Sequence, residues 1–351
     1  SALLEKITRV ASSGKELYCH SILERDKSGL IKACQLADSS QITYSHNKLG
    51  QCKKITHEHF EEHAKQFDVL GNLTLLQTKD TQGSYSKAFS YDFLSQLIAE
   101  EGPTNHTYSY DSLNNRLSHN NNAYSVNSLH AVLSDGARTF TYDLRGNRTS
   151  MQEQNGQTRY FYDALDRLVA VEPPGTTRYV YGYDGFNRRI LKEAFSQSAF
   201  GWEKTATTKY IYTLDNEIGS TDANNTICEL RILGEGRGAE IGAAIALELG
   251  GTIYTPIHDQ QGNVVTLLDH ATGGVVEHYR YDAFGNETAI QDASINPWRF
   301  SSKRVDPETG MSNFGRRYYD PTIGKWLTQD PLGLKAGPNL YAYCINNPMT
   351  H

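Results

Sequence analysis

Short runs of alternating β-forming and polar residues recur along the whole chain. The run TRYFYD at 158–163 ends in a Tyr-Asp pair, and the run DRLVAV begins three residues later, at Asp166. Alternation with a period of two predicts a strand with one buried face, and a short polar stretch between two such runs predicts a tight turn. Each unit of the pattern therefore predicts a β-hairpin.

The hairpin unit repeats along the sequence. When the Tyr of Tyr-Asp is taken as the anchor, most copies follow one another after 19–24 residues, about half the length of a propeller blade. The residue after the anchor is Asp in nine of the eleven copies, and the residue four past it is a turn former in every copy. The anchors are Arg25, His46, Phe67, Tyr91, Tyr110, Tyr142, Tyr162, Tyr183, Tyr212, His258 and Tyr281.

The residue types of the repeat explain its turn. An Asp side chain accepts a hydrogen bond from the backbone N–H two residues further on. The Gly or Asn four past the anchor can adopt the positive φ that a short hairpin loop requires. About eleven hairpins in series predict roughly twenty strands. We expect an all-β chain whose continuous sheet winds round on itself, because winding removes exposed sheet edges.

Composition excludes several classes of protein. The net charge is −6 with no polybasic run, so nucleic acid is not an expected partner. The apolar fraction of 38%, with 22 Tyr and 29 Gly, suits a large two-faced sheet rather than a dense aliphatic core. The five cysteines are scattered along the chain, so we expect them to be reduced thiols in a protein that is made in a reducing cytosol. The start, SALLEKITRV, has no signal peptide, and the most apolar run, at 241–249, is far shorter than the roughly 20 residues of a membrane span.

The last fifty residues carry the most specific pattern. They read RFSSKRVDPETGMSNFGRRYYDPTIGKWLTQDPLGLKAGPNLYAYCINNP at 299–348. With the Tyr-Asp-x-x-Gly-Asn/Arg repeats, this run resembles the RHS-repeat-associated core of RHS/YD-repeat proteins. Members of that family include polymorphic toxins, the C component of insecticidal ABC toxins and, more distantly, teneurins. The resemblance implies a hollow β-cocoon of repeats over residues 1–298, closed by a core segment over 299–351 that winds inward.

The resemblance also implies a function. In such relatives the shell encloses a variable C-terminal toxin, which an aspartate-dependent self-cleavage severs from the shell. Two Asp-Pro-x-Gly-Leu motifs supply the carboxyls, one kept protonated as acid while the other acts as base. The first motif is DPLGL, which places Asp330 as the candidate catalytic residue. The sequence stops about where the second is expected, so the chain is at most half of a single-turnover aspartic protease. The alternative is a turn-forming Asp-Pro, like Asp306-Pro307 and Asp320-Pro321.

Two arginines near this motif invite an electrostatic role. Arg316 and Arg317 could pair with Asp320 or Asp330 and hold a carboxylate ionised. Ordinary ion pairs between strands are at least as strong an expectation.

Two further motifs could carry chemistry but favour structural interpretations. His59, Glu62 and His63 have the His-x-x-Glu-His order of a zinc peptidase, which requires a helix. Their place between two Tyr-Asp turns favours a polar strand edge or a short surface helix with no metal. The run GEGRGAEIGAAIALEL at 234–249 lacks the residues of a phosphate loop. It favours an inserted loop and a short apolar element packed on the inner wall, without a cofactor.

Two functions stay open at this level. The first is a protective shell around a toxin fused beyond His351, completed by a partner shell chain if eleven hairpins are too few to close. The second is an extracellular adhesion scaffold whose tyrosines stack on cell-surface carbohydrate. Both predict a secreted or cell-surface protein.

Overall fold

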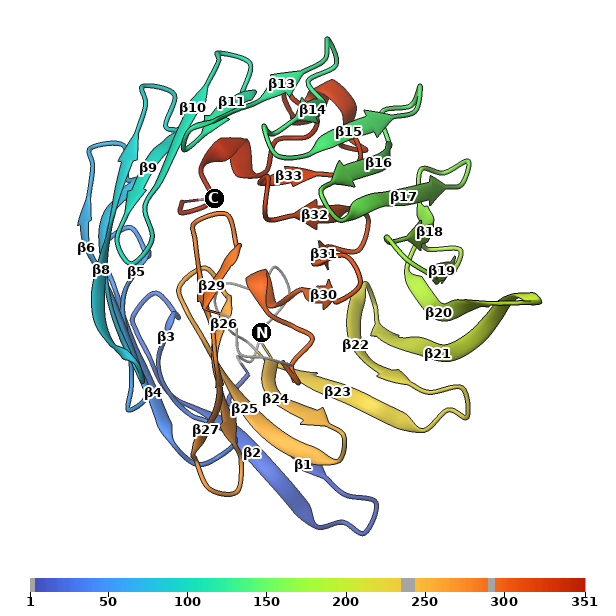
Figure 1. Cartoon of the computed structure of the whole chain (residues 1–351). Helices are drawn as coiled ribbons and strands as arrows, with labels where there is room; N and C mark the ends of the chain where they lie inside the picture. The colour runs from blue at the N-terminus through green and yellow to red at the C-terminus, as the bar shows by residue number, and fades with distance from the viewer. Residues whose placement is uncertain (1–3, 235–243, 290–293, 351) are drawn as a thin grey trace.

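The computed structural model describes residues 4–234, 244–289 and 294–350. The chain is all-β, with 55% of its residues in strands and 3% in helix. Neighbouring strands pair antiparallel in sequence order, so each sheet is a simple meander (Figure 1). No helical segment in the described part of the chain has the length and apolar character of a membrane span. The predicted all-β fold is confirmed.

The strands form two large sheets and two small ones. The 12-stranded sheet contains β1 (Lys6–Val10), β2 (Glu16–Arg25), β3 (Ile31–Gln35), β4 (Gln41–His46), β5 (Cys52–His57), β6 (Phe60–Phe67), β7 (Leu73–Asp80), β8 (Gly83–Tyr91), β9 (Leu97–Glu101), β10 (His106–Tyr110), β11 (Arg116–His119) and β12 (Asn122–Ala123). The 15-stranded sheet contains β13 (Ser125–Val126), β14 (Val132–Ser134), β15 (Thr139–Tyr142), β16 (Arg148–Glu153), β17 (Gly156–Tyr162), β18 (Leu168–Glu172), β19 (Thr177–Tyr183), β20 (Arg189–Ser198), β21 (Gly201–Thr213), β22 (Asn216–Thr221), β23 (Ile227–Leu233), β24 (Ala244–Leu249), β25 (Thr252–His258), β26 (Val264–Asp269) and β27 (Val275–His278).

The small sheets follow the large ones in the chain. The two-stranded sheet is β28 (Arg280–Tyr281) with β29 (Glu287–Ala289). The four-stranded sheet contains β30 (Arg304–Asp306), β31 (Met311–Asn313), β32 (Tyr318–Asp320) and β33 (Lys325–Trp326). Short 3₁₀ turns flank it, namely η1 (Phe300–Ser302), η2 (Gly333–Ala336) and η3 (Cys344–Asn346).

The long strip of strands curves round, and its end passes inside its beginning (Figure 1). On the overlap, the Arg9 guanidinium on β1 donates to Glu248 on β24 at 2.8 Å, and the Tyr18 hydroxyl donates to the same carboxylate at 2.7 Å. Ile42 of the outer layer and Ile257 of the inner layer share one apolar cluster. Strands β30–β33 lie within the ring (Figure 1). The predicted winding of the sheet into a shell is confirmed.

The repeat corresponds to the hairpin turns. Every anchor is the last residue of a strand or, for Tyr212, the residue before the last. In a representative turn, Asp143 Oδ1 accepts the backbone N–H groups of Arg145 and Asn147, both at 2.9 Å, and Gly146 has a φ of 82°. The predicted bond two residues beyond the Asp is present, and a second bond four residues beyond it also closes the loop.

One repeat departs from the predicted turn. Ten of the eleven residues four past the anchor have positive φ, but Asn216 begins β22 instead. There Thr213 pairs with Asn216 across a two-residue turn, and Leu214 takes the positive φ, at 54°. The anchor Tyr212 lies one residue before the strand end, so the prediction for Asn216 was wrong.

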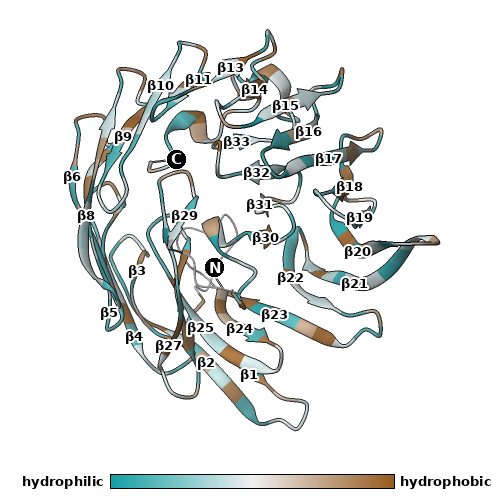
Figure 2. Cartoon of the chain, viewed as in Figure 1, coloured by the Kyte–Doolittle hydropathy of each residue, from teal (hydrophilic) through white to brown (hydrophobic). Residues whose placement is uncertain are grey.

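Apolar and polar residues alternate along many strands, as Figure 2 shows for β1, β2 and β23. The inward side chains of β5–β10 join the largest apolar cluster, which also contains Tyr319, Trp326 and Tyr343 of the C-terminal segment. The core therefore lies between the curved wall and the segment inside it. Half of the 22 tyrosines are buried.

Two glycines test the contact between wall and interior. Gly29 and Gly146 both have a φ near 82°, but a Cβ on Gly29 meets nothing within 4 Å, whereas one on Gly146 meets Gln329 and the Tyr341 hydroxyl. We expect Gly29→Ala to cost about 1 kcal/mol of backbone strain. Gly146→Ala should cost about 2 kcal/mol more, because the Tyr341 hydroxyl, which donates to the Gly146 carbonyl at 2.7 Å, must move. Urea unfolding measures both, and equal costs would contradict this packing.

Candidate functional site

The site is built on one inward-facing position of the repeat, six residues past the anchor. This residue opens the strand that follows the turn in every copy except that of Tyr212, and in several copies it is an apolar core residue such as Leu73 or Leu97. In three copies it is arginine, at Arg116 on β11, Arg148 on β16 and Arg189 on β20, each at most 1% exposed. We call these three residues the arginine ladder.

Each member of the arginine ladder reaches the C-terminal segment. Arg116 Nη1 donates to the Ile323 carbonyl at 2.9 Å. Arg148 Nη1 donates to Asp320 Oδ2 at 2.8 Å, and the Arg148 backbone N–H donates to the Leu327 carbonyl at 3.1 Å. The ladder therefore joins separate strands of the wall to one inner segment.

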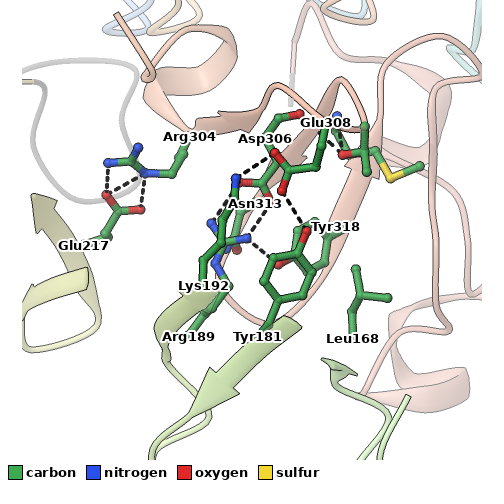
Figure 3. A network of polar contacts seen from close by, with 12 residues as sticks. Leu168, Tyr181, Arg189, Lys192, Glu217, Arg304, Asp306, Glu308, Asn313 and Tyr318 are labelled. Carbon is green, nitrogen blue, oxygen red and sulfur yellow. Dashed lines mark hydrogen bonds and ion pairs between the residues drawn. The ribbon is translucent and has the colours of Figure 1, made fainter. Parts of the chain in front are cut away.

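Arg189 makes the most extensive contact of the three. Its guanidinium binds the Asp306 carboxylate through both terminal nitrogens, with Nη2 at 3.0 Å from Oδ1, and Nη1 also donates to the Tyr318 hydroxyl at 2.7 Å. Such a forked pair fixes direction as well as distance. Figure 3 shows Arg189 and Asp306 pointing toward each other from β20 and β30.

Aromatic rings surround the buried guanidinium groups. Arg116 lies 4.2 Å from the ring centre of Phe284 and 4.7 Å from that of Tyr108. Arg148 lies 4.5 Å from the Phe140 ring centre. Burying a cation costs several kcal/mol, which ion pairs and ring faces offset. Tyrosines and phenylalanines of the repeats supply these rings.

The carboxylates that meet the ladder are held ionised. Burial alone would raise the pKa of Asp320, but the Arg148 and Arg138 guanidinium groups outweigh it and leave that pKa below its usual value. Burial likewise acts to raise the pKa of Asp306, and Arg189 and Lys192 bring it below the usual value. The sequence predicts a turn for both aspartates and, for Asp320, an ion pair with Arg316 or Arg317 instead of Arg148.

The ion pairs extend around the ladder into a wider network (Figure 3). Lys192 Nζ lies 2.6 Å from Glu308 Oε2, and the Tyr181 hydroxyl donates to Glu308 Oε1 at 2.9 Å. Arg304 on β30 lies 2.8 Å from Glu217 on β22. The inner segment is therefore held to the wall through both an acidic residue, Glu308, and a basic residue, Arg304.

Asp330 lies at a turn after β33. Its carboxylate Oδ1 accepts the Leu332 N–H at 2.9 Å, and its backbone N–H donates to the Leu340 carbonyl at 2.9 Å. Arg317 Nη2 lies 2.8 Å from Asp330 Oδ2, and its guanidinium stacks 4.0 Å from the Trp326 ring centre. The predicted pairing of Arg317 with Asp330 is present. The charged group that Asp330 contacts here is therefore a guanidinium and not a second carboxyl.

A cavity of about 230 Å³ lies beside Asp330. Arg145, Arg167 and Arg316 line it together with Asp330 and Arg317. Arg316 is exposed. Asp320, the other predicted partner of Arg316 and Arg317, is instead bound to Arg148. The geometry gives Asp330 both a turn-forming role and a place at the edge of a charged cavity.

The zinc-like motif adopts a hairpin instead of a helix. His59 lies in the turn between β5 and β6, where its ring contacts the Gly273 carbonyl at 3.2 Å. Glu62 is buried while its strand neighbour His63 is only partly so, as expected for opposite faces of a strand. The helical geometry is therefore wrong, and the polar strand is confirmed. Among the described residues, His, Cys, Asp and Glu form no group of three that could hold a metal ion.

The glycine-rich motif is only partly described. Residues 235–243 lie outside the described ranges. The apolar run that follows is β24, a strand of the large sheet whose Ala246 and Leu247 are fully buried. The predicted packing of this apolar element on the inner wall was wrong, because the element pairs with β23 and β25 and is itself a strand of the wall.

The arginine ladder was missed in the sequence although its signal is present. Arg116, Arg148 and Arg189 follow Asn-Asn, Gly-Asn and Asn-Arg at the same place in three repeats. Other repeats place Leu73 or Leu97 there, and a position that is otherwise apolar is an inward one. An arginine at an inward position requires a buried partner.

Tandem hairpins wound around an inward C-terminal segment define a YD-repeat β-shell. The chain belongs to the teneurin YD-shell family, whose model matches residues 31–349. It is 30% identical over 280 residues to tRNA nuclease WapA of Bacillus subtilis, covering 74% of this chain and 11% of that protein. It is 27% identical over 356 residues to toxin protein Tse5 of Pseudomonas aeruginosa, covering 93% of this chain and 24% of that protein.

A solved structure shows the same fold. The crystal structure of TcdB2-TccC3-TEV matches with a TM-score of 0.58 and 18% identity, covering 99% of this chain and 21% of that one. Another relative, double-stranded DNA deaminase toxin A of Burkholderia cenocepacia, is 27% identical over 80% of this chain and 21% of its own length. The chain spans less than a third of the length of each of these proteins.

Removing one member of the ladder should destabilise the fold strongly. Arg148→Met leaves the Asp320 carboxylate buried without its ion-pair partner, which should cost about 3–5 kcal/mol in urea unfolding. Arg145→Met is the matched control, because Arg145 pairs with Asp166 at side-chain exposures of 56% and 37%, and its loss should cost under about 1 kcal/mol. Adding Asp320→Asn to Arg148→Met should recover part of the loss. A cost for Arg148→Met no larger than that of the control would contradict the role of the ladder.

Proposed function

We propose that this chain is the enclosing shell of a secreted or cell-surface toxin-delivery protein and that it holds a C-terminal effector domain in its interior. The observation that carries the proposal is the position of the last described residues. They lie inside the ring (Figure 1), where Asn346 Nδ2 donates to Gln96 Oε1 and Asn347 Nδ2 donates to Asn72 Oδ1, both at 2.9 Å. A domain joined to this end would begin within the wall.

The arginine ladder supports the same proposal. Residues 1–298 would form the wall, and residues 299–351 would form the core segment that lines and closes it. Arg148–Asp320 and Arg189–Asp306 join residues 172 and 117 positions apart. Such contacts keep the core segment in place while leaving the domain beyond it free to vary.

The relatives also support a shared shell. One is named for tRNA cleavage and another for DNA deamination, yet both align with this chain over a small part of their length. A region common to proteins with different named activities is better suited to holding an effector than to being one. Strand alternation buries about half of the tyrosines whatever the function, but the other half are only partly exposed, so the adhesion scaffold receives less support.

Asp330 is proposed as one carboxyl of a self-cleaving aspartate pair. It lies beside the cavity of about 230 Å³, where Arg317 Nη2 lies 2.8 Å from its carboxylate, and a self-cleaving pair needs two carboxyls that share such a place. The second carboxyl would come from residues that follow this sequence. A self-cleaving protease cuts its own chain once. Both carboxyls and the peptide bond to be cut belong to one molecule, so no separate substrate has to be bound and oriented.

Self-cleavage can be tested in the natural protein extended by its next thirty or so residues. The extended chain should split beyond the second motif, and Asp330→Asn should block the cut while leaving the melting temperature within a few degrees. Asp222→Asn is the matched control, because Asp222 closes an ordinary turn by accepting the Asn224 and Thr226 N–H groups. Mass spectrometry reads the cut. Cleavage of the Asp330→Asn chain at the wild-type rate would leave Asp330 as a turn residue only.

Encapsulation is tested by proteolysis of the full natural protein. An effector domain enclosed by the shell should survive trypsin at least about tenfold longer than the same domain expressed alone, because digestion must wait for the shell to open. Equal lifetimes would overturn the proposed enclosure, whatever the outcome for Asp330.

A further inference from the structure

The overlap between the two ends of the strip uses a contact that occurs twice. Glu62 Oε2 on β6 accepts the backbone N–H of Gln260 at 2.9 Å, and Glu100 Oε2 on β9 accepts the N–H of Ala283 at 2.8 Å. Gln260 and Ala283 hold the same place in their repeats, two past the anchor. In the turn after Tyr142 the equivalent residue is Leu144, which is fully exposed. Each of the two outer glutamates thus binds one inner turn, through the backbone N–H at the same position of the repeat.

Each contact buries two carboxyls side by side. Glu62 binds the residue next to Asp259, and Glu100 binds the residue next to Asp282. All four side chains belong to residues at most 8% exposed. Asp259 and Asp282 also close their own turns, each accepting two backbone N–H groups. The overlap therefore contains two buried carboxyl pairs between its layers.

The positive charge nearby does not balance these four carboxyls. Lys87 on β8 lies 2.6 Å from Glu100 Oε1 and donates to the Tyr281 carbonyl at 2.5 Å. Arg280 and His278 lie 2.8 Å and 3.1 Å from Asp80. Asp80 thus partners both of these basic groups on the inner layer.

A cavity of about 350 Å³ lies at this place. Glu62, Lys87, Asp259 and Asp282 line it, as does Tyr85, whose hydroxyl pKa burial raises above its usual value. One lysine among four buried carboxyls leaves an excess of negative charge unless protons are bound.

We propose that this overlap is a proton-dependent closure of the shell: the inner turns stay on the outer strands while the Glu62–Asp259 pair and Asp282, beside Glu100, keep their protons, and the layers separate when these groups ionise. The proposal goes beyond the enclosing function and holds whether or not a cargo is present. The ligand of the site is the proton itself.

The titration of these groups supports the geometry. Burial, followed by the charge of Asp259, raises the pKa of Glu62 to about 8. Burial raises the pKa of Asp259 to about 6, and burial with the charge of Glu100 raises that of Asp282 to about 7. Ordinary unfolded values are about 4. The folded chain thus binds more protons, so this contribution is complete below about pH 4 and is lost as the pH rises through about 6 to 8.

Buried histidines act in the opposite direction and must be separated from the carboxyls. Burial lowers the pKa of His258 and of His20 to about 4, so their contribution is lost as the pH falls below about 6. The total pH profile of stability therefore mixes both effects. Replacing one carboxyl with its amide removes one titration and leaves the histidines unchanged.

The test compares Glu62→Gln with the wild-type chain between pH 5 and pH 9. The amide oxygen still accepts the Gln260 N–H and carries no charge. We expect both proteins to melt within about 2 °C of each other at pH 5 and Glu62→Gln to melt at least about 3 °C higher at pH 9. Glu61→Gln is the matched control, since Glu61 pairs with Lys54 at 3.1 Å and is 40% exposed. It should follow the wild type at every pH.

Hydrogen exchange locates the effect. At pH 9 the backbone of residues 258–264 should exchange faster in the wild type than in Glu62→Gln, whereas residues 148–153 on the ladder should exchange equally in both. A melting difference that does not change with pH would overturn the proposal and leave Glu62 as a plain hydrogen-bond acceptor. If Glu62→Gln does not fold, Asp282→Asn provides the same comparison with the same criteria. Survival of the effector domain in trypsin is a separate measurement, so failure of one proposal is distinguishable from failure of the other.

Discussion

Buried charge pairs between the wall and the core segment are the constraint on which this shell depends. A strip of hairpins has no intrinsic reason to curve around one particular segment, because each hairpin bonds only to its neighbours. Arg148–Asp320 and Arg189–Asp306 remove that freedom, since a guanidinium left in an apolar interior without its carboxylate costs several kcal/mol. The position of the core segment within the wall follows in part from satisfying these arginines.

A single repeat position produces both the packing and the fixed placement of the core segment. Where the sixth residue past the anchor is Leu73 or Leu97, the wall gains apolar core without directional preference. Where it is Arg116, Arg148 or Arg189, the same geometry aims a charged fork at one place inside. Because the arginines fall on separate strands along the wall, they hold the core segment at several points. A difference at one inward position between otherwise similar repeats thus fixes where the core segment lies.

The elements set by local chemistry could be predicted, and the pairings set by curvature could not. The turn at Asp143–Asn147 follows from residues at most four apart, so the sequence contains all of its causes. Asn216 was predicted wrongly because a two-residue turn places the positive φ on Leu214 instead. Arg317 and Asp330 were paired correctly as neighbours in one segment. Arg148 and Asp320 are 172 residues apart, and only the closed strip brings them together.

The two sides of the shell solve the burial of charge in opposite ways. On the ladder, arginines keep the pKa values of Asp306 and Asp320 low, so this attachment is present above about pH 4 and is lost only when these carboxylates take up protons. On the overlap, the contacts of Glu62 and Glu100 with the inner turns bring buried carboxyls together, and these contacts are lost when protons leave. The core segment and the inner turns are continuous in the chain, so both must hold for the interior to stay closed. A shell built this way is most stably closed in mildly acidic solution. At lower pH the ladder is the weaker attachment, and at higher pH the overlap is the weaker one.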